Sequence, residues 1–241
     1  LLCLVAMEAP TSLDHEQIRG EKIKVLQALR PIPANEVGNK TVRGQYTAGA
    51  INGEAVPAYA DESGAPPESP SSTETFVAIK AEVDNWRWAG VPFFIRAGKG
   101  MAETVTEAVI ELRQTPQDLF APEGKPPANV IRFRMKPDDV ISMSMQAKVP
   151  GDGMRAQGVD LTVDYGEALG GDGPDPYERL IGDSLDGDPR LFARQDSVEE
   201  AWRIVEGVLD SQTPIHEYRR GSWGPDCGPL LPDGLCWPDQ P

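Results

Sequence analysis

The chain has 241 residues, of which 39% are apolar and 25% are charged, and its formal net charge is −15. These proportions are typical of a globular protein and exclude a disordered or a membrane-spanning one. A chain this acidic has no electrostatic basis for binding nucleic acid. An anionic ligand would need local groups of Lys and Arg that overcome the field of the whole protein.

The first seven residues, LLCLVAM, form an apolar run without an initiating Met. The run is too short to cross a bilayer and lacks the basic segment and cleavage site of a signal peptide. We interpret it as the end of a helix whose first turns lie upstream, and we expect its apolar surface to pack against a missing domain. The three cysteines are sparse and odd in number, which favours a reducing, cytoplasmic location. A disulfide between Cys227 and Cys236 is the minor alternative.

A helix is predicted over residues 15–30, where apolar side chains recur at helical spacing after the N-capping oxygens of residues 11–14. A second helix is predicted over 196–209, with acidic residues in its first turn. Residues 34–75 are rich in Gly, Pro and Ser, and the part near 57–72 has the composition of a loop-rich insert. Residues after 209 are predicted to be irregular.

Five segments between these helices alternate apolar and polar side chains, as half-buried strands do: 76–83, 106–112, 129–136, 140–148 and 159–165. They are joined mostly by loops, with a helix at each end of the series. This order predicts an α+β fold with a mostly antiparallel sheet.

One group of cations follows a strand-like VPFF, in the segment IRAGKG at 95–100. Arg96 and Lys99 flank a turn of small residues, where backbone N–H groups and a Lys side chain can approach an anion together. The alternative is a solvated loop with ordinary charges, and the residue pattern by itself favours that alternative.

A second group is Arg132, Arg134 and Lys136, which a period of two places on one face of a strand. Three cations in a row repel one another unless an anion or carboxylates lie among them. A solvent-facing sheet surface paired with Asp or Glu is the simpler interpretation of the pattern.

The sequence pattern does not contain the groups of a complete active site. His15 and His216 have no evident partner, and no Ser elbow or metal-ligand cluster occurs. No Gly-rich loop stands between a strand and a helix, so nothing predicts a dinucleotide or metal site. By itself the sequence indicates a binding domain without catalytic groups.

Several segments resemble the C-terminal part of glucose-6-phosphate dehydrogenase, in order and in spacing, over residues 1–225. They read LLCLVAMEAP, IRGEKIKVLQAL, VRGQYTAG, TETFVAIKAEVDNWRWAGVPFFIRAGKGM, DPYERLIGD and EEAWRIVEGVL. The long block at 73–101, with NWRWAGVPF followed by R-x-G-K, is the most specific. The Pro/Gly-rich tail at 226–241 does not take part in the resemblance and is expected to be irregular.

The resemblance implies a substrate-binding and dimerisation domain, with a large mostly antiparallel sheet and helices packed on one face. It implies oxidation of D-glucose 6-phosphate to 6-phospho-D-glucono-1,5-lactone with NADP or NAD, in the oxidative pentose phosphate pathway. The Rossmann half that binds the cofactor would be missing and the general base would lie upstream of Leu1, so this chain alone is expected to be inactive. A homodimer or tetramer is expected. The alternative is a non-catalytic dimerisation or interaction module derived from that domain.

The resemblance also assigns substrate-binding residues. Lys99 matches the substrate-contacting Lys of R-x-G-K, and Thr104 matches a polar or cationic position five residues later. Lys136 matches a polar position before the Pro of a later strand, and the two lysines are expected to converge on the phosphate. In the competing interpretation they pair with Glu103 and Asp138.

Some members of the resembled family hold a second, structural NADP in this domain, which requires several cations after the R-x-G-K turn. Here Val105 and Val109 stand at such positions, and only Arg96 and Arg134 match contacts of that site. No structural NADP is therefore expected.

Overall fold

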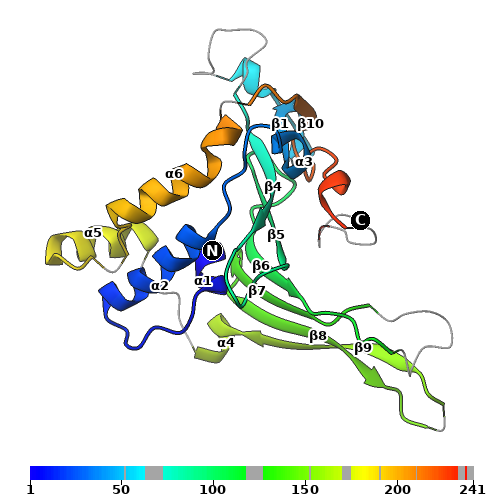
Figure 1. The fold of residues 1–241 in the computed structure, drawn as a ribbon. Coiled ribbons are helices and arrows are strands. Elements are labelled where there is room, and N and C mark those ends of the chain that lie inside the picture. The colour runs from blue at the N-terminus through cyan, green and yellow to red at the C-terminus, as the bar shows by residue number, and fades with distance from the viewer. Residues whose placement is uncertain are drawn as a thin grey trace. The chain divides into compact units, whose positions relative to one another are not determined.

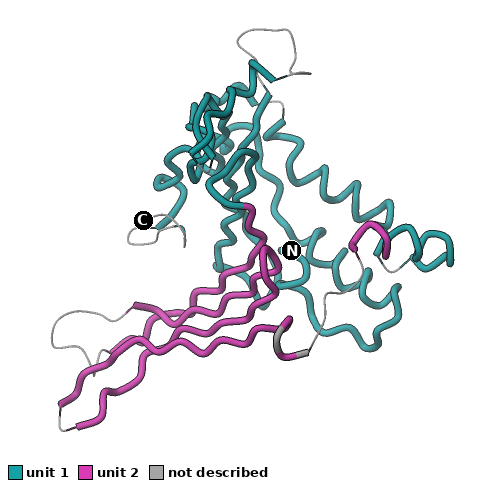
Figure 2. The backbone as a smooth tube through the Cα atoms, turned by 180° about the vertical axis from the view of Figure 1, so that it is seen from behind, with its two compact units in different colours: residues 1–103, 180–241 teal, residues 104–179 magenta. Residues whose placement is uncertain are grey.

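The computed structural model describes residues 1–51, 53–62, 73–117, 127–151, 153–169, 175–189, 191–209, 211–232 and 237. The described chain divides into two compact units, one of residues 1–103 with 180–241 and one of residues 104–179 (Figure 2). Helices and mostly antiparallel sheets occur together, so the predicted α+β class is confirmed. The strands form two four-stranded sheets and a two-stranded one.

The first unit contains a sheet of order β10-β1-β4-β5. Its strands are β1 (Thr41–Thr47), β4 (Phe76–Glu82), β5 (Pro92–Gly98) and β10 (Ile215–Arg219). The pairs β1–β4 and β4–β5 are antiparallel, whereas β10 lies parallel to β1 with Tyr218 beside Tyr46. Segments about 170 residues apart in the chain are therefore neighbours in this sheet.

Strand β4 is buried on both faces, which is more than its alternation predicted. Ala81 and Val83 lie on the expected apolar face, in a core cluster with Ile204. Phe76 and Ala78 point to the opposite face and are as deeply buried, in a second cluster. A strand covered on both sides is a rigid support for the turn that follows its neighbour β5.

The helices of this unit are α1 (Leu2–Ala6), α2 (His15–Ala28), α3 (Val37–Lys40) and α6 (Gln195–Leu209). Helix α2 begins as predicted, because the Asp14 carboxylate accepts a hydrogen bond of 2.9 Å from the Glu16 amide. Helices α2 and α6 lie side by side (Figure 1), and α6 contributes Ile204 to the core with Ala81 and Val83. The Trp88 indole N–H holds α1 through the Ala6 carbonyl at 2.9 Å.

The second unit is a fully antiparallel sheet of order β6-β7-β8-β9. Its strands are β6 (Thr106–Glu111), β7 (Val130–Lys136), β8 (Val140–Lys148) and β9 (Ala156–Asp164). Helix α4 (Tyr165–Leu169) follows the sheet, and the boundary between the units falls inside α5 (Pro176–Asp186). Tyr165 was predicted to end the last strand but is the first residue of α4.

The register of this sheet separates apolar from polar side chains. Directly paired residues share a face, and one face carries an apolar set comprising Ala108, Ile110, Ile131, Phe133, Ile141, Met143, Met145, Val159, Leu161 and Val163. We call this set the apolar sheet face. The opposite face carries Arg132 and Arg134, as the period of two predicted. No residue described in this unit is buried, and Leu161 on the apolar sheet face is 56% exposed.

Strands β1 and β10 of the main sheet were not predicted, and neither were the short strands β2 and β3. Strand β1 lies in the Gly-, Pro- and Ser-rich stretch 34–75, before the loop-rich insert, where no strand was predicted. Strand β10 lies after residue 209, where an irregular structure was predicted, so that prediction was wrong. Gly44 interrupts the pattern of β1, and β10 is short and mostly polar. Strand β10 pairs only with the distant β1, and β1 pairs with both β10 and β4. A local pattern carries no information on such long-range pairing. The helix α5 was likewise not predicted.

The remaining elements are β2 (Gly49–Ile51), β3 (Glu54–Val56), η1 (Tyr59–Asp61) and η2 (Gly228–Leu230). Most of the predicted insert, and Cys236 with its alternative disulfide, lie outside the described residues. Cys227 is a free thiol. Cys227, Leu230 and Trp237 of the tail are buried in the cluster of Phe76, so this part of the tail completes the core of the first unit. Among the described residues no helix is long and apolar enough to span a membrane.

Candidate functional site

The turn after β5 presents the Lys99 side chain to solvent. Lys99 is exposed, and its ammonium has no ion pair or hydrogen bond with any residue that the structure describes. The predicted alternative of an ion pair with Glu103 is not observed, although Glu103 is among the described residues. A solvated ammonium without a carboxylate partner can bind an anionic ligand without first losing an ion pair.

The backbone of this turn is tightly held. The Lys99 amide donates to the Thr75 carbonyl at 2.8 Å, so it is not free to bind an anion as the small-residue turn had suggested. Gly100 has a φ of +58°, in the left-handed region that glycine adopts without strain, and its carbonyl accepts from the Gly221 amide at 2.7 Å. A Cβ on Gly98 would lie 2.9 Å from the Phe76 ring. Both glycines of the motif are therefore required by the conformation that displays Lys99.

Arg96, the other cation of the segment, has a different role. Its guanidinium lies over the rings of Trp223 and Trp237, at 5.2 and 4.9 Å from their centroids. It therefore links β5 to Trp223, which follows β10, and to Trp237 in the tail through cation–π contacts. The two cations of IRAGKG therefore differ in their surroundings: Arg96 packs against two tryptophan rings, and Lys99 faces solvent.

The polar face of the second sheet has carboxylates among its cations. Glu107 on β6 pairs with Arg132 at 2.8 Å and lies 3.4 Å from Arg134. This matches the simpler interpretation of the row as a sheet surface neutralised by acidic residues. Lys136 at the end of β7 is exposed and has no ion pair with any described residue, Asp138 included.

Thr104 and Lys136 are brought to the same end of one strand pair. Lys136 pairs across the sheet with Thr106, two residues after Thr104, where β6 begins and β7 ends. Thr104 is also exposed. Lys99 belongs to the first unit and these two residues to the second, so the predicted convergence of all three on one ligand stays a prediction.

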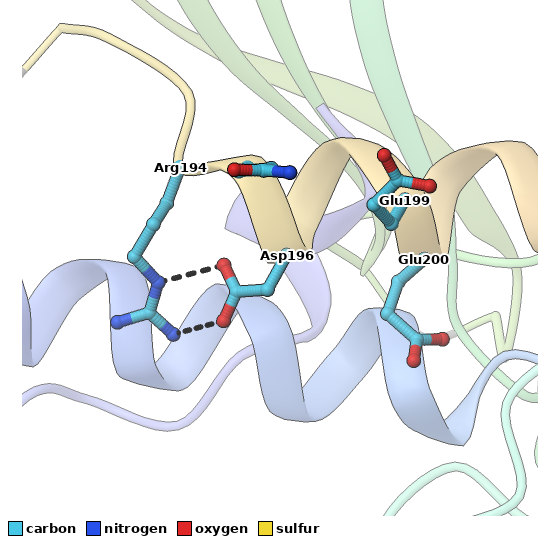
Figure 3. A pocket seen from close by; sticks show the side chains of 5 residues that line it. Arg194, Asp196, Glu199 and Glu200 are labelled. Carbon is cyan, nitrogen blue, oxygen red and sulfur yellow. Dashed lines mark hydrogen bonds and ion pairs between the residues drawn. The ribbon is translucent and has the colours of Figure 1, made fainter.

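A surface depression at the start of α6 does not suit an anion. It is lined by Arg194, Gln195, Asp196, Glu199 and Glu200, of which three are acidic (Figure 3). Its single guanidinium is taken by Asp196 at 2.7 Å and by Glu16 at 3.0 Å. The hydrogen bonds from Arg194 lower the pKa of the Asp196 carboxyl, which therefore stays ionised and keeps the depression negative. A phosphate would be repelled from this surface.

The described residues include one passage from a strand directly into an α-helix, the place where a loop for a pyrophosphate would stand. The passage from β9 into α4 runs through Asp164 and Tyr165, which provide no glycine loop for a pyrophosphate. Within the described parts of the chain, no group of three or more His, Cys, Asp or Glu residues is arranged to hold a metal ion. What the geometry offers is a solvent-facing Lys on a rigid turn, and a second Lys beside a Thr.

Comparison with known proteins identifies the family. Residues 1–231 match the model of the protein family described as "Glucose-6-phosphate dehydrogenase, C-terminal domain". The chain belongs to this family. The glucose-6-phosphate 1-dehydrogenase of Rhizobium meliloti (strain 1021) is 44% identical over 247 residues, covering 99% of this chain and 50% of that protein. That of Mycolicibacterium smegmatis is 43% identical, covering 98% and 49%. The chain thus spans about half the length of these curated relatives.

Solved structures agree with this assignment. The crystal structure of glucose-6-phosphate 1-dehydrogenase from Mycobacterium avium matches with a TM-score of 0.82 and 36% identity, covering 99% of this chain and 48% of that one. A glucose-6-phosphate dehydrogenase in complex with its substrate glucose-6-phosphate matches with a TM-score of 0.82 and 32% identity, covering 98% and 48%. The fold and family inferred from the sequence are therefore confirmed.

Sequence reasoning missed the residues that support the turn. Thr75 and the segment around Gly221 hold the Lys99 backbone, but they lie 24 and 122 residues away in the chain. Neither has a local pattern that points to this task. Only the pairing of β10 beside β1 brings the Gly221 segment to the turn.

Proposed function

We propose that the chain is the substrate-binding half of a glucose-6-phosphate dehydrogenase, and that Lys99 binds the phosphate of glucose 6-phosphate. The observation that carries the proposal is the exposed Lys99 of R-x-G-K, on a rigid turn and without an ion-pair partner among the described residues, in a chain of this family. The solved relative in complex with glucose-6-phosphate supports this choice of substrate.

The charge of the chain makes such a local contact necessary. A phosphate monoester carries about −1.5 to −2 at neutral pH, and the chain carries −15. A charge-assisted bond from an ammonium to phosphate contributes about 1.5–3 kcal/mol. Lys136 would add a second charge, and Thr104 a neutral hydrogen bond from its hydroxyl.

The oxidation itself would require a second half of the protein. NADP would accept the hydride from C1 of the sugar, and C1 would become the carbonyl carbon of the lactone. Neither a general base nor a dinucleotide cradle is evident in the described residues, and hydride transfer requires reacting atoms held about 3–3.5 Å apart. In this proposal the present chain binds and orients the sugar phosphate, and the other half holds the cofactor and removes the proton.

The test is to join this chain, in one reading frame, to the amino-terminal half of the Rhizobium meliloti relative. The joined protein should reduce NADP with glucose 6-phosphate but not with glucose. The 241-residue chain alone should show no turnover, because loss of a general base by itself costs about 10²- to 10⁴-fold. A folded joined protein without turnover would support the non-catalytic module instead, and turnover by the chain alone would contradict the division of tasks.

We also propose that the apolar sheet face associates with a second copy of the chain. Val159, Leu161 and Val163 are 41%, 56% and 51% exposed, and Phe133 is 37% exposed. Contiguous apolar patches of this kind are uncommon on soluble monomers. A dimer formed through this face would remove the patch from water and would suit both the enzyme and the alternative module.

A further inference from the structure

The hydroxyl of Tyr218 makes a contact that packing alone does not require. Tyr218 lies on β10 and is 4% exposed, in the core cluster of Phe76. Its oxygen lies 2.7 Å from the Lys99 carbonyl, 2.9 Å from the Thr75 hydroxyl and 3.2 Å from the Thr75 carbonyl. The side chain thus reaches from β10 to the backbone of the turn that carries Lys99.

The donors and acceptors available in each group arrange these contacts into one hydrogen-bond network. A phenol has a single proton, and the shortest distance assigns it to the Lys99 carbonyl. The Thr75 hydroxyl then donates to the Tyr218 oxygen and accepts from the Tyr46 amide at 3.0 Å. Burial raises the pKa of the Tyr218 phenol, so the donor keeps its proton at neutral pH. The Tyr218 hydroxyl, the Thr75 hydroxyl and the carbonyls that they contact all have partners in this network, which makes the arrangement rigid.

The segment after Tyr218 holds the other side of the same turn. The Gly221 amide donates to the Gly100 carbonyl at 2.7 Å, and the Ala102 amide donates to the Ser222 carbonyl at 3.0 Å. The turn between β5 and Ala102 is therefore held to β10 and the residues that follow it. We call the contacts of the Tyr218 hydroxyl and of the Gly221–Ser222 backbone with this turn the clamp. The direction of the Lys99 side chain depends on the clamp, because no described residue holds the ammonium itself.

We propose that Tyr218 is a positioning residue for substrate binding, which acts by fixing the Lys99 carbonyl and so the direction of the Lys99 side chain. The inference rests on the proposed role of Lys99 and names a residue that sets its geometry. Tyr218 does not itself contact the sugar phosphate in this proposal. Its loss would weaken substrate affinity only through Lys99.

The clamp can be tested without a ligand, by amide hydrogen exchange of the 241-residue chain. Tyr218→Phe removes one hydroxyl and keeps the ring, and Tyr46→Phe is the matched control in the same aromatic cluster. We expect the Lys99 amide to exchange roughly tenfold faster in Tyr218→Phe and at the original rate in Tyr46→Phe. An unchanged Lys99 rate in Tyr218→Phe would overturn the clamp.

The positioning role is tested by a double-mutant cycle on glucose 6-phosphate affinity, measured by titration of the same chain. We expect roughly three- to tenfold weaker binding in Tyr218→Phe, at least tenfold weaker binding in Lys99→Ala, and no further loss when both changes are combined. Additive losses would overturn the proposal, because Tyr218 would then act by another route. No effect of Lys99→Ala, or no affinity of the original chain, would overturn the proposed function and the positioning role with it. The exchange result on the clamp would still stand.

Discussion

The two units of the chain differ in how their sheets are covered. In the first unit β4 is buried on both faces, with Ala78 fully buried and Val83 1% exposed. In the second unit the apolar sheet face is open, and no residue described there is buried. Both sheets have four strands, so the number of strands does not account for the difference.

The difference indicates a division of tasks. The covered sheet holds a short turn in one conformation, as the binding role that we propose for Lys99 requires. The open sheet has apolar side chains in register across four strands without a layer over them, which favours association. The sheet of the first unit is covered by residues of the same chain, whereas we propose that the sheet of the second unit is covered by a second copy.

The largest expected difference in stability between the units concerns two phenylalanines. Phe76 is 2% exposed, and Phe76→Ala should lower the free energy of unfolding by about 3–5 kcal/mol. Phe133 is 37% exposed, and Phe133→Ala should lower it by about 1 kcal/mol or less. Urea denaturation at a protein concentration low enough to prevent association measures both. Equal losses would contradict the contrast in burial.

Association is the next test, and adjacent residues of β9 provide the control. Leu161 lies on the apolar sheet face, and its neighbour Thr162 points to the opposite face. Leu161→Lys should weaken self-association by roughly ten- to a hundredfold, because a charge placed in an apolar interface loses its hydration. Thr162→Lys should leave association unchanged. Sedimentation of the chain at micromolar concentration distinguishes these outcomes, and a monomeric original chain would refute the proposed interface.

A smaller effect concerns the tail and depends on pH. Burial raises the pKa of the Cys227 thiol from its ordinary value of 9.0 to about 11. The folded chain therefore keeps a proton that the unfolded chain loses near pH 9, so the free energy of unfolding falls as pH rises from about 9 to about 11. The loss amounts to roughly 2–3 kcal/mol, at about 1.4 kcal/mol per pKa unit.

The variant Cys227→Ala removes this contribution while the raised pKa values of Tyr46 and Tyr218 remain in both proteins. We therefore expect a shallower decline of stability for the variant over the same pH range, measured by urea denaturation at several pH values. If the stability of both proteins declined equally with pH, the Cys227 thiol would not be the group that keeps its proton in the folded state.

Local pattern predicted the second unit better than the first. Strand β8 was predicted with its observed bounds, because its alternation and that of its neighbours are complete within one stretch of chain. Strand β10 was missed because it is short and mostly polar, and its parallel pairing joins residues about 170 positions apart. Strand β1 was missed because Gly44 interrupts its pattern and both its neighbours lie far along the chain. The site shows the same limit. Lys99 was identified from the resemblance of the R-x-G-K segment, but Thr75 and Tyr218, which hold its turn, have no signal of their own.

The central claim is that Lys99 binds the phosphate of the substrate, and the substrate KM of the joined protein tests it most directly. Lys99→Ala should raise the KM for glucose 6-phosphate by roughly ten- to a hundredfold and leave the KM for NADP nearly unchanged. Lys136→Ala should act in the same direction more weakly. Lys24→Ala, which removes a surface Lys paired with Glu21 on α2, should change neither value. An unchanged KM for glucose 6-phosphate in Lys99→Ala would contradict the account.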